Sequence, residues 1–336
     1  MDNIALLHAP FAYALGLPAT TSEFKSQPGD FVVNENLDIS FTGEGEHHYL
    51  HVQKTGENTP FIANELARFL KIKPLNISFS GMKDRHAITS QWYSVQLPGK
   101  DLDLNWDEFV AFSGVNAHLI ATEQHNKKLR RGAHSSNDFV ITLRHVQQSD
   151  DLDARLHDIA QNGVPNYFGF QRFGRNNENL VQANAWLLGK TRVQNKSRKS
   201  LYMSSARAFL FNVVLSARVK ERSWQTPLSG EPDMLHATAP LWGRGHTGCK
   251  GDALLFEQTA LIPFAAWCDK MEHLGLNQER RPLVLKPQNF SWIYKDDTLV
   301  ITMRLQPGQF ATAVLREITQ LNQPAVTAHT TKQIEE

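Results

Sequence analysis

Strand-like and helix-like patterns alternate along the first half of this chain, and that alternation limits its fold more than any other feature. Apolar and polar residues alternate around Phe31 and Phe139, as in half-buried strands. Thr59 followed by Pro60 predicts the start of a helix that continues to Lys71. The sequence lacks the glycine pattern of a dinucleotide-binding fold, so we expect a mixed α+β core and not a doubly wound sheet. The predicted strands are 30–35, 48–53, 75–79, 88–97 and 137–146, and the predicted helices are 59–71 and 149–161.

The region that begins at about Gly163 differs in character from the segments before it. It is rich in aromatic and arginine residues, has a helical pattern at 204–219, and is then dominated by turns. A strand at 298–305 and a helix at 311–318 follow, and they would return to the first sheet. A chain of 336 residues can form two cores, so we expect the middle region to be an inserted domain. Residues 323–336 are expected to form a polar tail.

Composition excludes several classes of protein. Hydrophobic residues make up 41% of the chain, yet no apolar run approaches the ~20 residues that span a bilayer. The first residues lack the basic region of a signal peptide. Cys249 and Cys268 are the only cysteines and have neither metal-binding nor disulfide spacing. We therefore expect no bound metal and a location in the cytoplasm.

The net charge of +1 is too small to attract a polyanion to the whole molecule, so any contact with RNA must come from local clusters. One such cluster consists of Lys127, Lys128, Arg130 and Arg131, and a second basic stretch lies at 190–199. For each cluster alone, a solvated loop and a phosphate-binding loop are equally good interpretations. Two clusters in a nearly neutral chain favour RNA.

The segment from Phe79 to Gln91 contains the best candidate for catalysis. Strand patterns before Gly81 and after Ala87 place Asp84 at the tip of a turn. Lys83 and Arg85 flank Asp84 and are expected to favour its ionised form, that of a nucleophile or an ion-pair partner. From chemistry alone, however, a solvated charged turn is the better interpretation.

The residues around Asp84 resemble a known catalytic signature. The sequence Gly-Met-Lys-Asp-Arg-His-Ala-Ile-Thr-Ser-Gln at 81–91 resembles that of the TruD family of tRNA pseudouridine synthases, whose aspartate attacks the ribosyl uracil. Further segments resemble the same family, in the expected order and over nearly the whole chain. They lie at 24–35, 137–139, 163–174 and 305–317.

The resemblance implies a fold, a reaction and a set of site residues. The fold would be an α+β pseudouridine synthase core of residues 1–158 and 303–336, with the family's insertion domain at 159–302. The reaction would convert uridine 13 of tRNA to pseudouridine without a cofactor, with Asp84 as nucleophile and Lys25 beside it. No membrane and no obligatory protein partner is indicated. The residues implied to contact the substrate are Phe31, Asn137, Phe139 and Phe310.

Several alternatives stay open at this point. The three phenylalanines could be ordinary core residues, and Phe139 cannot accept a proton, so the base that removes the C5 proton is unassigned. Attack at ribose C1′, addition at uracil C6 and a glycal route all suit an aspartate. The chain could also be a non-catalytic RNA-binding protein that retains the cleft, or a glycosidic hydrolase, although no second carboxylate is evident as a partner of Asp84.

Overall fold

A computed structural model describes residues 4–99 and 101–322 of the chain, and the predicted polar tail lies outside them. The chain forms two compact units. The first, which we call the helix-rich unit, comprises Met1–Ala19, Asp150–Pro287 and Gln309–Thr319. The second, which we call the sheet unit, comprises Thr20–Ser149, Gln288–Gly308 and Gln320–Glu336.

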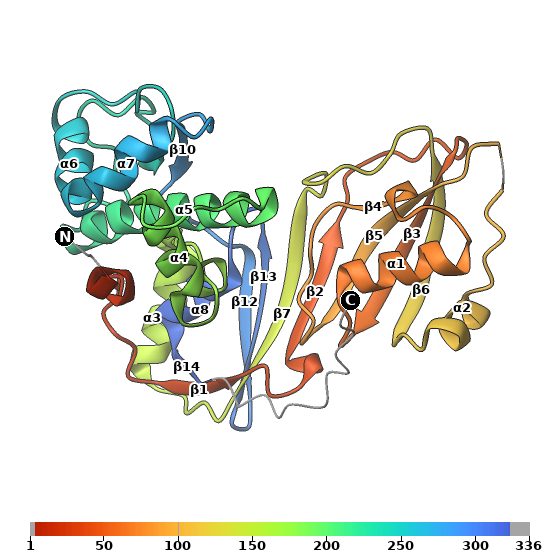
Figure 1. The fold of residues 1–336 in the computed structure, drawn as a ribbon. Coiled ribbons are helices and arrows are strands. Elements are labelled where there is room, and N and C mark those ends of the chain that lie inside the picture. Colours follow the sequence, from red (N-terminus) through yellow and green to blue (C-terminus); the bar gives the residue numbers. More distant parts are fainter. Residues whose placement is uncertain (1–3, 100, 323–336) are drawn as a thin grey trace. The chain divides into compact units, whose positions relative to one another are not determined.

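The sheet unit is built on one mixed, 10-stranded sheet (Figure 1). Its main path runs β12-β13-β7-β2-β5-β3-β6. Strands β2 and β5 pair in parallel, whereas the other neighbours on this path are antiparallel. The strands of the path are β2 (Phe31–Asn36), β3 (His47–Thr55), β5 (Ile88–Gln96), β6 (Ala117–His125), β7 (Ser136–Arg144), β12 (Gln288–Lys295) and β13 (Thr298–Leu305). Off the path, β1 (Thr21–Phe24) pairs with β7 and β14 (Gln320–Asn322), and β4 (Ile77–Phe79) pairs with β5.

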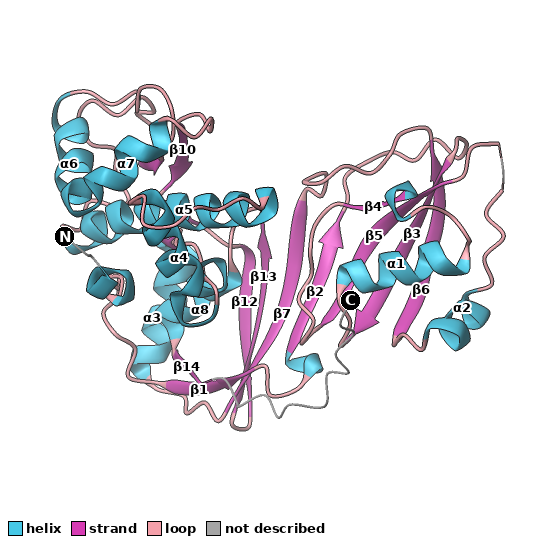
Figure 2. Cartoon of the chain, in the orientation of Figure 1, coloured by secondary structure: helices cyan, strands magenta, loops and turns pink. Residues whose placement is uncertain are grey.

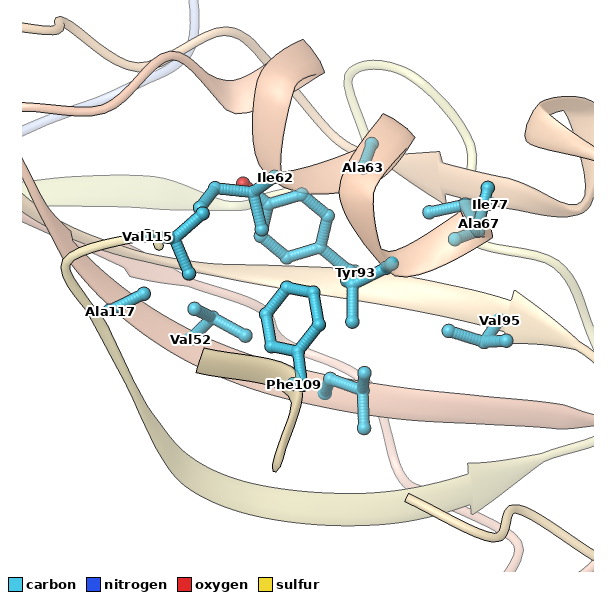
Figure 3. Packing of buried hydrophobic residues seen from close by; sticks show 12 residues of the cluster. Val52, Ile62, Ala63, Ala67, Ile77, Tyr93, Val95, Phe109, Val115 and Ala117 are labelled. Carbon is cyan, nitrogen blue, oxygen red and sulfur yellow. The ribbon is translucent and has the colours of Figure 1, made fainter. Parts of the chain in front are cut away.

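Two helices, α1 (Thr59–Phe69) and α2 (Trp106–Ser113), pack against the β3–β5 part of this sheet. Figure 3 shows buried residues of this cluster, among them Ile62 and Phe109. Ile62 and Leu66 project from α1 at helical spacing and are fully buried. They meet Phe109 of α2, which is also fully buried, and apolar residues from the strands beneath. This packing fixes the sheet face on which the candidate site lies.

Helices predominate in the other unit (Figure 2). Its longest helix, α5 (Lys196–Lys220), buries Phe209 and Phe211. Two short antiparallel pairs, β8 with β11 and β9 with β10, complete the unit. The remaining helices are α3 (Asp150–Asn162), α4 (Glu178–Leu187), α6 (Gly251–Leu261), α7 (Ala265–Glu272) and α8 (Ala311–Ile318), and the strands are β8 (Val164–Pro165), β9 (Thr238–Leu241), β10 (Glu279–Pro282) and β11 (Val284–Leu285).

The α+β prediction is confirmed, and two local predictions are wrong. Of the apolar run at 75–79, predicted as one buried strand, only Ile77–Phe79 forms a strand (β4); Leu75 lies in the short helical turn Pro74–Asn76 and is 68% exposed. Thr59 does not cap a helix. It is the first residue of α1, and its hydroxyl binds other groups, described below.

The predicted domain limits divide the chain differently from its compact units. The strand β13 joins the large sheet as expected, and β12 lies beside it, so residues 288–302 belong with the sheet. Helices α3 and α8 belong to the helix-rich unit. Compactness does not define a functional domain, so the boundaries at 158/159 and 302/303 stay a prediction.

Candidate active site

The turn that carries Asp84 connects β4 to β5 and is held by groups from distant parts of the sequence. The Gln91 side chain donates to the Gly81 carbonyl at 3.0 Å, and the Lys83 amide donates to the Thr59 hydroxyl at 3.0 Å. That hydroxyl donates in turn to the Gln91 side chain at 2.7 Å. Because Thr59 and Gln91 are fully buried, the turn is anchored to the core of the sheet unit.

The side chain of Asp84 forms an ion pair with Lys25. Asp84 Oδ2 lies 2.9 Å from Lys25 Nζ, and the two side chains are 37% and 11% exposed. The Lys25 ammonium also lies 3.9 Å from the ring centroid of Phe31, within cation–π range. Lys25 adopts a left-handed backbone with φ 61°, which is unusual for a residue other than glycine. Lys25 is thus held in a strained backbone conformation at the point where its ammonium contacts Asp84.

Lys83 and Arg85, the two cations that flank Asp84 in sequence, do not pair with its carboxylate, so this part of the prediction is wrong. Lys83 forms a buried ion pair with Glu35, whose other carboxylate oxygen accepts a hydrogen bond from the Trp92 amide at 3.3 Å. The Arg85 guanidinium donates to the Gly56 carbonyl at 3.1 Å. Consecutive residues in a turn point in different directions, so neighbours in sequence do not become partners in space.

Three of the four predicted substrate contacts, Phe31, Asn137 and Phe139, can be placed on the sheet by strand pairing. Phe139 of β7 lies opposite Val33 of β2, and Asn137 lies opposite Glu35. Directly paired residues project to the same side of a sheet, and residues two apart along a strand share a side. Phe31, Asn137 and Phe139 therefore share one face with Glu35.

The aromatic rings on this face are in contact with one another. Phe31 is buried, with its ring centroid 5.8 Å from that of Phe139 in an edge-on arrangement. Phe139 is only half-buried, so its ring has a free surface. Asn137 Oδ1 is buried and has no hydrogen-bond partner among the residues that the structure describes. An unsatisfied buried acceptor near a partly exposed ring is suited to an incoming donor.

Asp138 stands between these two residues and belongs to the other face. Its carboxylate accepts two hydrogen bonds from Arg304 of β13, at 2.6 Å and 2.8 Å. Hydrogen bonding to Arg304 lowers the pKa of Asp138. Asp138 is therefore a structural residue of the sheet.

The basic cluster of Lys127, Lys128, Arg130 and Arg131 follows β6 and is next to the start of the turn that carries Asp84. The amide of Gly132 donates to the Ser80 carbonyl at 2.7 Å, and the Lys128 ammonium donates to the Leu75 carbonyl at 2.7 Å. Leu129 is buried, whereas Lys127, Arg130 and Arg131 are exposed. The cluster thus presents three exposed cations in the segment that the Gly132 amide ties to Ser80.

Phe310 belongs to the helix-rich unit. It immediately precedes α8, and its ring centroid lies 5.6 Å from that of Phe168. The Arg281 guanidinium lies 4.2 Å from the Phe168 centroid. Phe310 is only partly buried, which leaves room for both a packing role and a contact role.

Two residues near the turn gave no recognisable signal in the sequence. Burial and the nearby charge of Lys83 lower the pKa of His134, which favours a neutral imidazole. A methyl group added at Gly81 would lie 3.6 Å from His134 Cε1, so the ring borders the turn. The second residue, Lys54, is fully buried and donates to the Asp84 carbonyl at 3.0 Å. A lysine in an alternating strand pattern is normally expected to face solvent, so the sequence did not indicate that Lys54 is buried.

The sequence of this chain is similar to those of known proteins. Residues 10–195 match the family model described as tRNA pseudouridine synthase D (TruD). The tRNA pseudouridine synthase D of Aeromonas hydrophila is 40% identical over 92% of this chain and 94% of that protein. That of Cellvibrio japonicus is 42% identical over 93% of each chain.

The fold also has a counterpart among solved structures. The crystal structure of a putative tRNA pseudouridine synthase D from Methanosarcina mazei superimposes with a TM-score of 0.69. It covers 94% of this chain and 97% of that one at 19% identity, which shows a common fold. Separately, no helix in the described ranges is long and apolar enough to cross a membrane.

Proposed function

Because the chain belongs to the TruD family of tRNA pseudouridine synthases, we propose that it isomerises uridine to pseudouridine in tRNA with Asp84 as the nucleophile. One observation supports this most: the Asp84 carboxylate is held 2.9 Å from Lys25, next to a face that carries a partly exposed ring and an unsatisfied amide oxygen. That combination provides an attacking group and a place for a flat base.

The proposed reaction exchanges one bond for another. The Asp84 carboxylate attacks ribose C1′ and forms a C1′–O bond, while the C1′–N1 bond breaks and uracil leaves with the electron pair. The base turns, C5 attacks C1′, and the carboxylate is displaced. The C5 proton is lost and N1 gains a proton. Atoms and electrons balance without an oxidant or a reductant. Addition at uracil C6 and a glycal route are alternative mechanisms that would also use Asp84.

The neighbouring residues suit these steps. Phe139 offers its ring face to the extruded uracil, and base–aromatic stacking contributes ~1–3 kcal/mol while tolerating rotation of the base. Asn137 Oδ1 can accept a hydrogen bond from the uracil N3–H group. Lys25, supported by Phe31, adds a positive charge beside the nucleophile. Phe310 is proposed as a further substrate contact on its motif alone.

A glycosidic hydrolase fits the site less well. A retaining hydrolase needs a second carboxylate about 5–5.5 Å from the nucleophile, free to exchange a proton. Glu35 is a carboxylate on this face, but it is fully buried in an ion pair with Lys83. Glu35 therefore holds the turn in place and is not available as an acid or a base.

The substrate and the location are part of the proposal. Uridine 13 of tRNA is the target that the family resemblance implies, and the exposed cations beside Ser80 would contact phosphates. Both cysteines are buried free thiols, and burial raises the pKa of each to about 12, which fits a reducing cytoplasm.

Asp84→Asn tests the assignment. We expect no pseudouridine in tRNA treated with this variant, and a tRNA affinity close to that of the unchanged protein, because the substitution removes the nucleophile and no phosphate contact. Pseudouridine is mapped after carbodiimide treatment, in tRNA from cells with and without the protein. Measurable product from the Asn variant would refute the nucleophile. Tight tRNA binding without product from the unchanged protein would instead support a non-catalytic RNA-binding protein.

A further inference from the structure

Lys54 lies near the end of β3, directly behind the catalytic turn. Its side chain is fully buried, and its ammonium donates to two backbone carbonyls, that of Glu57 at 2.7 Å and that of Asp84 at 3.0 Å. One side chain therefore joins the loop after β3 to the turn that presents the nucleophile. The contact is to the main chain of Asp84, whereas Lys25 binds its carboxylate.

Strand pairing places Lys54 on the same sheet face as the other site residues. Lys54 is paired with Thr89 of β5, Thr89 with Val33 of β2, and Val33 with Phe139 of β7. These four residues form a row across the sheet. Lys54 is thus part of the floor of the site and not of its periphery.

Using a buried ammonium to hold two carbonyls carries a cost in desolvation free energy. A charge removed from water is unfavourable unless it is paired, and Lys54 forms no ion pair among the residues that the structure describes. The uncharged Thr89 and Ala117 face it from β5 and β6. Glu57 and Asp84 act on it through space with negative charge, and Lys83 with positive charge. A neutral donor would suffice if the role were only structural.

We propose that Lys54 is a positioning residue, whose protonated form fixes the main chain of Asp84 and adds a positive charge under the nucleophile. The proposal rests on the proposed function, because it assumes that Asp84 attacks the substrate. It adds a prediction about pH that the Asp84–Lys25 pair alone does not make.

Burial lowers the pKa of Lys54 to about 8. As pH rises through 8, the ammonium loses its proton and its charge, so pseudouridine formation should fall. A single titration of this kind leaves about one-tenth of the enzyme protonated at pH 9, which predicts a roughly tenfold loss of rate.

Stability should respond to the same titration in the opposite direction. The unfolded chain has a lysine pKa of ~10.4, so between pH 8 and 10 the unfolded state binds more protons at this position than the folded state. The contribution of Lys54 to unfolding free energy therefore rises with pH over this range.

The test measures single-turnover pseudouridine formation on unmodified tRNA between pH 6.5 and 9.5, together with melting temperature. Lys54→Met is nearly isosteric and uncharged. We expect it to lower the rate ~10-fold or more on the acid side and to lack the decline near pH 8. Any decline caused by the substrate or by Lys25 would persist in this variant. Its melting temperature relative to the unchanged protein should fall as pH rises from 8 to 10.

Glu57→Gln is the matched control, and it remains informative if Lys54→Met does not fold. It retains the main-chain carbonyl that Lys54 binds but removes a negative charge that raises the pKa of Lys54. The decline in rate should therefore move to lower pH, with little change of rate on the acid side.

The possible results either support or overturn the proposed role of Lys54. Loss of the decline in Lys54→Met, or its downward shift in Glu57→Gln, supports the proposal. An unshifted decline in Glu57→Gln, or a Lys54→Met variant with the pH profile and rate of the unchanged protein, overturns it. Activity in Asp84→Asn would instead overturn the proposed function, so the two failures are distinguishable.

Discussion

Substitution of Phe139 by leucine separates a stacking platform from a core residue. Leucine retains most of the apolar volume and removes the aromatic face. The main loss in the folded protein is the edge contact with Phe31, at 5.8 Å, which is worth ~0.5–1.5 kcal/mol. Because Phe139 is half-buried and its strand is paired on both sides, we expect about 1 kcal/mol of destabilisation. A fully buried phenylalanine replaced by alanine costs ~3–5 kcal/mol.

The effect on catalysis should be larger than the effect on stability. Loss of base stacking removes ~1–3 kcal/mol, which corresponds to a roughly 5- to 150-fold decrease in kcat/KM. The assay compares pseudouridine formation with thermal unfolding, in which about 1 kcal/mol lowers Tm by ~2–4 °C for a unit of ordinary domain size. The control is Phe109→Leu. Phe109 projects from α2 into the core, so this substitution should reduce Tm and leave kcat/KM at low temperature unchanged. Near-normal activity of Phe139→Leu would refute the stacking role and make Phe139 a core residue. A drop in Tm large enough to explain the loss of activity would have the same consequence.

Three further predictions follow from residues around the site. Replacing Arg130 and Arg131 by alanine should weaken tRNA binding and lower the slope of log K against log salt by about one to two, and an unchanged slope would make the cluster a solvated loop. Lys25→Met should slow pseudouridine formation more than it weakens tRNA binding, and should destabilise the fold by less than ~2 kcal/mol, since Asp84 is partly solvated; an unaltered rate would exclude Lys25 from the reaction. Phe109→Ala should reduce the unfolding free energy by ~3–5 kcal/mol in denaturant titrations, and a loss below 1 kcal/mol would contradict the packing beneath α2.

The parts of the fold that sequence could predict are those with regular periodicity. The strand at 298–305 and the helices that start near Thr59 and Asp150 follow from spacing of period 2 or 3.6. The strands β6 and β12 were missed because they lie at the two edges of the sheet, where both faces tolerate polar residues.

The contacts within the candidate site were harder to predict from sequence than the strands and helices. The motif around Asp84 identified the turn, but the contacts that hold it come from residues far away in sequence. Lys25 lies 59 positions before Asp84, and Lys54 lies 30 positions before it. The alternating pattern predicts that Lys54 lies on one face of a strand, but it does not show that this face is covered by other residues. Only the folded chain shows that a lysine there is buried.

The two ends of Asp84 are secured independently, since Lys54 holds its main-chain carbonyl and Lys25 holds its carboxylate. A change confined to the carboxylate therefore leaves the main-chain anchor in place, and the turn keeps its shape. An inactive variant at this position should consequently present an unaltered docking surface to RNA. That makes Asp84→Asn a suitable form of the protein for capturing an unreacted tRNA complex, in which the extruded uridine can be seen before any bond is broken.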